Sequence, residues 1–271
     1  MMNHGTAEIA CKGVGIPVAY WVRPGEKGTV MYIHGLGCTK SDFEGAVNHR
    51  VMKEYTLVAF DLPGSGESLY PEGVKLGMDD LASITAELAL KLHLPQFTLI
   101  GHSMGGLIAL LFAEKYQDMV KGFINIEGNL SPEDCFFSRI AAKYSADEFT
   151  ERVFNAFKHN LVRSENRGIR EYAKSLETNA SRRAYHDYSC SLVDCCDDGG
   201  LIERFINMKV SRLFIYGSEN RELRYKPRLE KAGIITAEVP DSGHFPGCDN
   251  PDALYGLIGD YLQVLMPENR Q

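Results

Sequence analysis

Short apolar runs alternate with helical patterns along the first 130 residues, and this alternation limits the chain to one class of fold. The run from Thr29 to Ile33 is typical of a parallel strand that is buried on both faces. Residues 78–92 place leucine and isoleucine at helical spacing, and residues 103–116 show a second helical pattern. Alternating strands and helices with right-handed crossovers predict an α/β protein with an open sheet. The strands expected here are Ala7–Lys12, Pro17–Val22, Thr29–His34, Thr56–Asp61, Thr98–Gly101 and Gly122–Glu127.

The strand signals stop at about Ser131 and return at Ser211. The intervening segment begins with the helix-start pattern Ser-Pro-Glu-Asp and is rich in aromatic residues. We expect most of these rings to form the segment's own core, and the others to line an apolar pocket. Strands at Ser211–Tyr216 and Ile234–Pro240 and a helix over 251–265 then resume the alternation. The sequence thus predicts a core of residues 1–130 and 209–271 and a helical cap of residues 131–208.

The charge balance excludes several classes of partner. The 271 residues include 29 Lys and Arg against 36 Asp and Glu, a net charge of −7, which suits neither a nucleic acid backbone nor an anionic membrane. Seven irregularly spaced cysteines favour free thiols in a reducing compartment over a zinc site. The amino-terminal residues do not resemble a signal peptide, and no segment has the roughly 20 apolar residues that span a bilayer. We therefore expect a cytoplasmic protein, whose oligomeric state the sequence leaves open.

One motif carries chemistry. Gly101-His102-Ser103-Met104-Gly105 has the pattern G-x-S-x-G and stands between an apolar strand and a helical pattern. Glycines on both sides allow a sharp turn that lifts the serine hydroxyl above the carboxyl end of the sheet. The amino terminus of the following helix offers unpaired N–H groups and a positive dipole end, which favour developing negative charge. The motif identifies Ser103 as a candidate nucleophile.

A serine nucleophile needs a base, and His244 is the best placed of the eight histidines. It lies just after the last expected strand, in a loop that can reach back to the serine. We expect His34 to be a packing or hydrogen-bonding residue. The side chain of His102, next to the nucleophile, is expected to point away, and His186 is expected to be solvated rather than to contact substrate.

Together these motifs resemble those of the α/β-hydrolase-fold proteins over nearly the whole chain. The resembling segments are His34–Gly37, Asp61–Ser68, Gly101–Gly105 and Ser242–His244, each of which follows an expected strand. The resemblance implies an eight-stranded, mostly parallel sheet with helices on both faces and a cap inserted after the sixth strand. It also implies a triad in the order Ser–acid–His and an oxyanion hole formed by the backbone N–H groups of Leu36 and Met104. A serine at this turn argues against epoxide hydrolases and haloalkane dehalogenases, which use aspartate there.

The acid of the triad has two candidate positions. Most of the family places it after the seventh strand, where this chain has Asn220 at the usual aspartate position and Glu219 one residue earlier. Some members place a glutamate after the sixth strand, where this chain has Glu127. A carboxylate that ends an apolar strand is costly to bury without a partner, so a partnered role suits Glu127. We favour Glu127, with Glu219 as the alternative and Asn220 as a hydrogen-bonding neighbour.

The resemblance implies two-step acyl transfer to water by a serine hydrolase, most simply an esterase acting on a small ester with an apolar portion. The same triad also serves lactonases, thioesterases, C–C bond hydrolases and acyltransferases, and the sequence does not separate these. A non-catalytic ligand binder of this fold is the alternative from another class. No metal or organic cofactor is expected, because no sequence pattern for one is visible.

Overall fold

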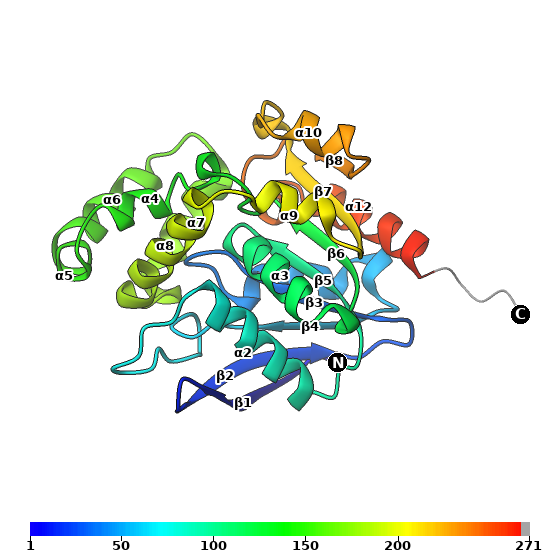
Figure 1. Cartoon of the computed structure of the whole chain (residues 1–271), viewed down its shortest axis with the longest axis horizontal. Coiled ribbons are helices and arrows are strands. Elements are labelled where there is room, and N and C mark those ends of the chain that lie inside the picture. Colours follow the sequence, from blue (N-terminus) through cyan, green and yellow to red (C-terminus); the bar gives the residue numbers. More distant parts are fainter. Residues whose placement is uncertain (267–271) are drawn as a thin grey trace, which may run out of the picture.

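A computed structural model describes residues 1–266 and contains one eight-stranded sheet in the order β1-β2-β4-β3-β5-β6-β7-β8 (Figure 1). The strands β3 to β8 run parallel, whereas the β1–β2 and β2–β4 pairs are antiparallel. This confirms the expected eight-stranded, mostly parallel sheet. The strands span Asn3–Cys11 (β1), Val14–Arg23 (β2), Thr29–Ile33 (β3), Thr56–Phe60 (β4), Phe97–His102 (β5), Val120–Ile126 (β6), Ser211–Gly217 (β7) and Ile235–Val239 (β8).

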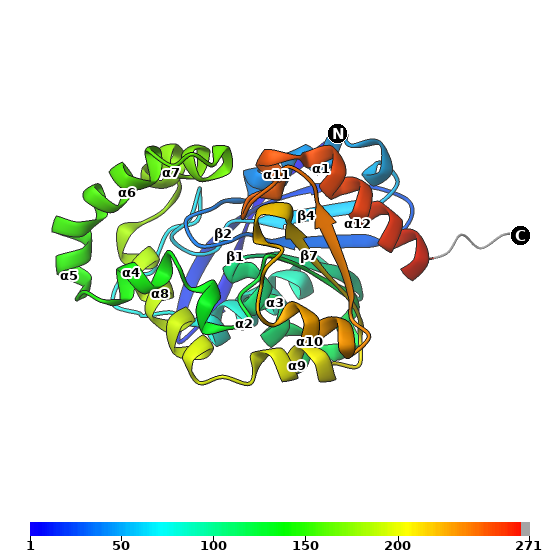
Figure 2. The ribbon, with the colours of Figure 1, turned by 90° about the horizontal axis from the view of Figure 1, so that it is seen from above.

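Helices cover both faces of the sheet, and each face has its own apolar core (Figure 2). One face carries α2 (Met78–Lys91), α3 (Met104–Lys115), α9 (Leu201–Asn207) and α10 (Lys226–Lys231). The opposite face carries α1 (Glu44–Asn48), α11 (Pro246–Asp249) and α12 (Pro251–Leu265). Helix α3 is buried along almost its whole length, as expected for a helix that lies against the centre of the sheet. Within residues 1–266, no helix combines the length and the apolar character needed to cross a bilayer.

The segment between β6 and β7 contains helices and short turns, and its residues 138–197 lie beyond the sheet end at which the parallel strands finish (Figure 1). It contains short turns at Pro132–Asp134 (η4) and Phe149–Val153 (η5, a π-helical turn) and the helices α4 (Ser138–Ala142), α5 (Ala146–Glu148), α6 (Phe154–Val162), α7 (Arg167–Asn179), α8 (Arg182–Asp197) and α9. The Ser131 hydroxyl accepts a hydrogen bond from the N–H of Glu133, so the predicted helix start is present. Helices α4 to α8 are called the cap below.

The last helix of the expected cap segment packs on the sheet. The ring of Phe205 in α9 lies 5.5 Å from that of Phe123 in β6 and 6.5 Å from that of Phe214 in β7. By these contacts α9 extends the core, whereas the boundary expected from the sequence placed residues 201–207 in the cap. The helical pattern of the sequence was correct, but the sheet, rather than the other cap helices, buries the apolar face of α9.

Backbone hydrogen bonds join the cap to the loop after β4. The N–H of Gly66 donates to the carbonyl of Asn179 at 2.8 Å, and the N–H of Ser181 donates to the carbonyl of Gly64 at 2.7 Å. The same loop begins at the buried Asp61, whose carboxylate pairs with the buried Lys40 at 2.5 Å. The junction of α7 and α8 is therefore attached to a loop that is itself fixed by a buried ion pair.

The start of α3 lies very close to the end of β3. A Cβ atom at Gly105 would lie 2.2 Å from the carbonyl oxygen of Ile33 and 2.7 Å from that of His34. These are backbone atoms, which cannot move aside as the end of a side chain can. The glycine is therefore required for helix α3 to begin directly above the sheet.

We expect Gly105→Ala to destabilise the protein by about 3 kcal/mol, because the added methyl group would force the backbone of α3 away from β3. The measurement is denaturant unfolding at equilibrium. Gly256→Ala is a matched control, since its Cβ in α12 would meet nothing within 4 Å, and we expect it to stabilise the protein by roughly 0.5–1 kcal/mol. Equal stability of the two variants would contradict this explanation.

Candidate active site

Ser103 lies in a strained turn between β5 and α3. Its φ of 53° is unusual for a residue other than glycine, and strain of this kind costs roughly 1–3 kcal/mol. Two hydrogen bonds fix the turn: the Ser103 N–H donates to the carbonyl of Ile126 at 3.0 Å, and the N–H of Gly106 donates to the Ser103 carbonyl at 2.8 Å. The side chain is consequently held above the carboxyl end of the sheet.

Glu127 occupies a second strained turn, directly after the neighbouring strand β6. It has a φ of 50°, and its N–H donates to the carbonyl of Ile215 at 2.9 Å. A Cβ atom at Gly106 would lie 2.6 Å from the Cα atom of Gly128, so the two turns touch. This arrangement brings the Glu127 carboxylate to the same sheet edge as the Ser103 hydroxyl, although 24 positions separate the two residues in the sequence.

His244 bridges the two side chains. Its Nε2 atom accepts from the Ser103 hydroxyl at 3.0 Å, and its Nδ1 atom lies 3.4 Å from Oε2 of Glu127, to which an Nδ1 proton would donate. Both His244 and Glu127 are buried. The carboxylate favours the tautomer protonated at Nδ1, which leaves Nε2 free to take a proton from the serine.

Both carboxylate oxygens of Glu127 have further partners. Oε1 accepts from the backbone N–H of Gly217 at 2.6 Å, and Oε2 accepts from the side-chain amide of Asn220 at 2.9 Å. Asn220 thus has the hydrogen-bonding position expected for it. Glu219 is exposed, and its carboxylate accepts from the side chain of Asn166 at 2.9 Å instead of contacting His244. The structure therefore brings Ser103, His244 and Glu127 together and leaves Glu219 apart.

A narrow hollow of about 20 Å³ opens at Ser103 and His244. Gly35 and Leu36 form one side, and a Cβ atom at Gly35 would lie 3.1 Å from that of Ser103. Met104 is the first residue of α3, so its backbone N–H is among those without an acceptor inside the helix. The N–H groups of Leu36 and Met104 belong to the two segments that flank the serine hydroxyl.

Aromatic rings from the start of the helical segment cover this hollow. The ring of Phe136 packs edge-on against that of His244 at 4.8 Å, and the ring of Phe137 lies 6.2 Å from it. Most of the other rings in the segment form its own core, as expected: the ring of Phe149 stacks on that of Tyr185 at 5.7 Å, and both are buried. Phe136 and Phe137 are thus the rings of this segment that line the hollow at Ser103.

Two histidines differ from their expected positions. The His102 side chain does not point away: its Nε2–H donates to the backbone carbonyl of His244 at 2.7 Å, and the two rings are 5.1 Å apart. His186 is buried rather than solvated, and its Nε2 atom lies 2.9 Å from the carbonyl oxygen of Tyr144. His34 has the packing role expected of it, since its Nε2 atom accepts from the N–H of Leu62 at 2.9 Å.

The surroundings of His102 set its charge. Burial, followed by the neighbouring His244, lowers the pKa of His102 from 6.5 to about 3. At neutral pH the ring is therefore uncharged and continues to donate from Nε2. A further residue of the hollow that the sequence did not indicate is Asp134, whose carboxyl pKa burial raises to about 7. Its oxygens accept from the N–H groups of Leu130 and Ser131 and from the hydroxyl of Tyr225.

The seven cysteines are all free thiols, either buried or partly buried. Among the described residues 1–266, no group of three or more His, Cys, Asp or Glu side chains is arranged to hold a metal ion.

The comparison with protein families agrees with this geometry. A family model described as the alpha/beta hydrolase fold matches residues 28–184, which is more than half of the chain. The chain belongs to this family. The matched region includes the turns that carry Ser103 and Glu127 and ends within the cap of this hydrolase-fold chain.

Solved structures with the same fold include hydrolases of more than one kind. A thermophilic esterase from Thermogutta terrifontis superposes with a TM-score of 0.79 at 18% identity, over 97% of this chain and 99% of its own. An enol-lactonase from Burkholderia xenovorans LB400 gives a TM-score of 0.77 at 19% identity, over 95% and 100% of the two chains. The N-acyl homoserine lactonase AidH gives a TM-score of 0.75 at 16% identity, over the full length of both. At these identities the likeness is one of fold.

Curated relatives share a shorter stretch. The mouse protein Epoxide hydrolase 4 is 30% identical over 147 residues, which is 51% of this chain and 38% of that protein. An uncharacterized protein of Mycobacterium tuberculosis is 31% identical over 101 residues, which is 35% of this chain and 27% of that protein. The chain thus matches between about a quarter and two fifths of the length of these two relatives.

The depressed pKa of His102 predicts how stability depends on pH. The unfolded chain binds a proton near pH 6.5, whereas the folded one binds it only near pH 3, so the unfolded state holds more protons between these values. Stability should fall as pH decreases through this window, by up to about 1.4 kcal/mol per pH unit from this one group. Urea unfolding between pH 7 and 4.5 should show a steeper decline for the wild type than for His102→Gln. Parallel curves would contradict the assignment.

Proposed function

We propose that the protein is a serine hydrolase of small carboxylic esters, in which Ser103, His244 and Glu127 form the catalytic triad. The observation that carries the proposal is the continuous hydrogen-bonded chain from the Ser103 hydroxyl through His244 to Glu127. These residue types in this order are the nucleophile, base and orienting acid of acyl transfer. The fold of the family and its esterase neighbour support the same reading.

The reaction proceeds in two steps. His244 takes the proton of Ser103 as the serine oxygen attacks the ester carbonyl, and the N–H groups of Leu36 and Met104 hold the resulting oxyanion. A donor of this kind typically lowers the barrier by about 3 kcal/mol. His244 then gives its proton to the leaving alcohol, and an acyl group remains on Ser103. In the second step His244 activates a water molecule, which releases the acid and restores the serine.

Burial supports the role of Glu127. The carboxylate balances the imidazolium that forms on His244, and its bonds to Gly217 and Asn220 hold it in place. Such preorganised charges act most strongly where water is excluded. We propose that the cap and the rings of Phe136 and Phe137 supply that exclusion, and that residues 131–208 act as a mobile lid over the site.

A lactone is the second candidate substrate class. The observation that favours it is that two of the solved structures with this fold are lactonases, with TM-scores of 0.77 and 0.75. A lactone is a cyclic ester, so the same attack and oxyanion site serve it. Thioester and C–C bond cleavage and acyl transfer use the same triad, and a non-catalytic binder would keep the fold without turnover.

A fluorophosphonate probe separates the hydrolases from the binder, because it labels only an activated serine. Labelling of the wild type that is lost in Ser103→Ala would support a hydrolase, and an unlabelled, folded wild type would favour the binder. A panel of p-nitrophenyl esters of increasing acyl length, with γ-lactones and one thioester alongside, then ranks the substrate classes. An esterase should show its highest kcat/KM on the esters.

We expect Ser103→Ala to lower kcat by about 10⁶ and to leave the fold intact, because no other group can form the acyl intermediate. The activity on the best ester of the panel and a circular dichroism melt are the measurements. If the alanine variant kept more than a tenth of the wild-type activity, Ser103 would not be the nucleophile.

The acid is tested with two matched amide variants. Glu127→Gln removes the charge opposite His244 and places an amide where the carboxylate now accepts from Gly217 and Asn220, so kcat should fall by about 10³–10⁴. Glu219→Gln is the control, because the Glu219 carboxylate contacts Asn166 and not His244. It should change kcat by less than about threefold, the scale of a lost surface contact. The opposite ranking would assign the acid to Glu219.

A further inference from the structure

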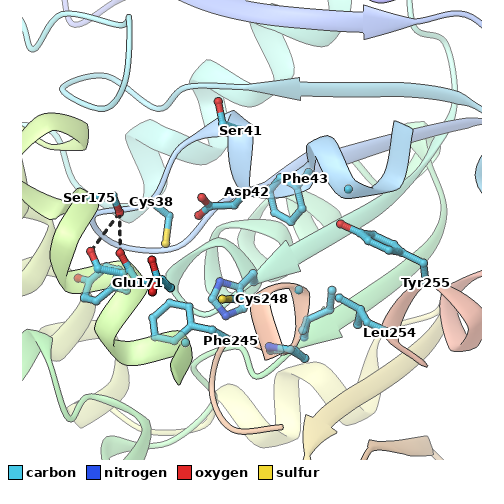
Figure 3. Close-up of a pocket in the computed structure, with 17 residues that line it drawn as sticks. Cys38, Ser41, Asp42, Phe43, Glu171, Ser175, Phe245, Cys248, Leu254 and Tyr255 are labelled. Atoms are coloured by element: carbon cyan, nitrogen blue, oxygen red, sulfur yellow. Dashed lines mark hydrogen bonds between the residues drawn. The ribbon is translucent and has the colours of Figure 1, made fainter. Parts of the chain in front are cut away.

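A larger cavity lies beside the hollow that contains Ser103. It has a volume of about 460 Å³ and is bounded by the turn at Lys40–Phe43 (η1), by α7 of the cap, and by α11 and the start of α12 (Figure 3). Cys38, His102 and Phe245 line both spaces, so these three side chains form the wall between them. A ligand in the cavity would touch His102, which donates a hydrogen bond to the His244 carbonyl, and Phe245.

The cavity has the composition of a small-molecule site. The aromatic residues Phe43, Tyr172, Phe245 and Tyr255 are among those that line it, and a volume of this size suits one small organic molecule. Tyr172 and Phe245 stack with ring centres 5.0 Å apart, which fixes the wall on the cap side. These rings offer faces to an apolar group or to a cation.

One carboxylate in this cavity has no cationic partner. Asp42 lines it, and its side chain lies with that of Cys38 on one wall (Figure 3). Asp42 is exposed to solvent on the cavity side. Partial desolvation raises the pKa of its carboxyl, while hydrogen bonds from the Cys38 thiol and the backbone of Thr39, together with the nearby His34, lower it. Within residues 1–266 no Lys or Arg side chain forms an ion pair with Asp42, and the nearby Lys40 is bound to Asp61 and Glu67, both at 2.5 Å.

The other acid of the cavity is already balanced. The Glu171 carboxylate pairs with Lys174 at 2.7 Å, and this ion pair lowers its pKa, with further contributions from Arg167 and Arg170 on the same helix. The positive charges on α7 therefore balance the negative charge of Glu171. Asp42 on the facing wall remains the only uncompensated charge among the described residues that line the cavity.

We propose that this cavity binds an organic ammonium compound, with the cation against Asp42 and an apolar body among the four aromatic rings. An ammonium group supplies the positive partner that the Asp42 carboxylate lacks, and the aromatic ring faces attract the same cation. Two sources share this chemistry: an ammonium-bearing arm of the ester substrate, which rests on the proposed function, or a free amine that binds beside the reactive hollow.

Calorimetry tests the site without reference to catalysis. Three probes of matched shape are titrated at pH 8: 3-phenylpropylammonium, 3-phenylpropanol and 3-phenylpropionate. The ammonium should bind wild-type protein at least about tenfold more tightly than the alcohol, and the carboxylate should bind most weakly. Equal affinities for the three, or no binding of any at millimolar concentration, would overturn the proposal. This comparison uses the wild type, so it does not depend on the folding of a variant.

Two variants locate the charge. Asp42→Asn should abolish the preference for the ammonium and keep the affinity for the alcohol. Glu171→Gln is the matched control from the facing wall, and it should keep at least half of the preference because Lys174 already neutralises that carboxylate. A preference that survives Asp42→Asn and disappears in Glu171→Gln would refute the assignment to Asp42.

Kinetics distinguishes the two sources. If the cation is part of the substrate, an ester with an ammonium group on one arm should exceed its neutral isostere about tenfold in kcat/KM, and the free ammonium should raise the KM for the neutral ester. If the cation is a separate ligand, the ammonium ester has no advantage, and the free ammonium binds without raising that KM. Absence of all ester turnover and of fluorophosphonate labelling would contradict the proposed function. The calorimetric result would still show whether the cavity binds an ammonium compound.

Discussion

The close approach of backbone at the carboxyl ends of β3, β5 and β6 is the constraint on which the site depends. A helix that begins directly above the sheet forces Ser103 to a φ of 53°, and the adjoining turn forces Glu127 to 50°. Each strained residue is fixed by a hydrogen bond to the next strand along the sheet, from Ser103 to β6 and from Glu127 to β7. The sheet therefore holds both side chains above its edge. Its backbone hydrogen bonds and its buried apolar faces stabilise the folded state enough to prevent the two strained turns from relaxing.

The cap completes the site from the other side. Its attachment to Gly64 and Gly66 places α7 and α8 over the sheet edge, and Phe136 and Phe137 before α4 reach His244. The same attachment places α7 against the turn that follows β3, which encloses the larger cavity. One set of backbone contacts thus governs both the cover over Ser103 and the shape of the neighbouring cavity.

Much of this arrangement could be predicted from the sequence because local patterns determine it. The central strands β3 to β7 match short, largely apolar runs, and the G-x-S-x-G pattern fixes Ser103 since only glycine tolerates the contacts around it. The positions that could not be predicted depend on distant contacts. Helix α9 packs on the sheet, and His186 is buried where its ring lies at hydrogen-bonding distance from the carbonyl of Tyr144. The ring of His102 donates a hydrogen bond to the loop that carries His244. The larger cavity combines five separate stretches of the chain, so no local pattern indicates it.

The neutral charge of His102 connects these features. A charged ring at this position would oppose any positive charge on His244, whose ring is 5.1 Å away, and it would also repel a cation in the larger cavity. Burial keeps its pKa near 3, so the ring stays uncharged at neutral pH. Its Nε2–H nevertheless continues to donate to the His244 carbonyl at 2.7 Å. The buried His102 can therefore hold the backbone of His244 in position, and form part of the wall between the hollow and the larger cavity, without adding a charge of its own.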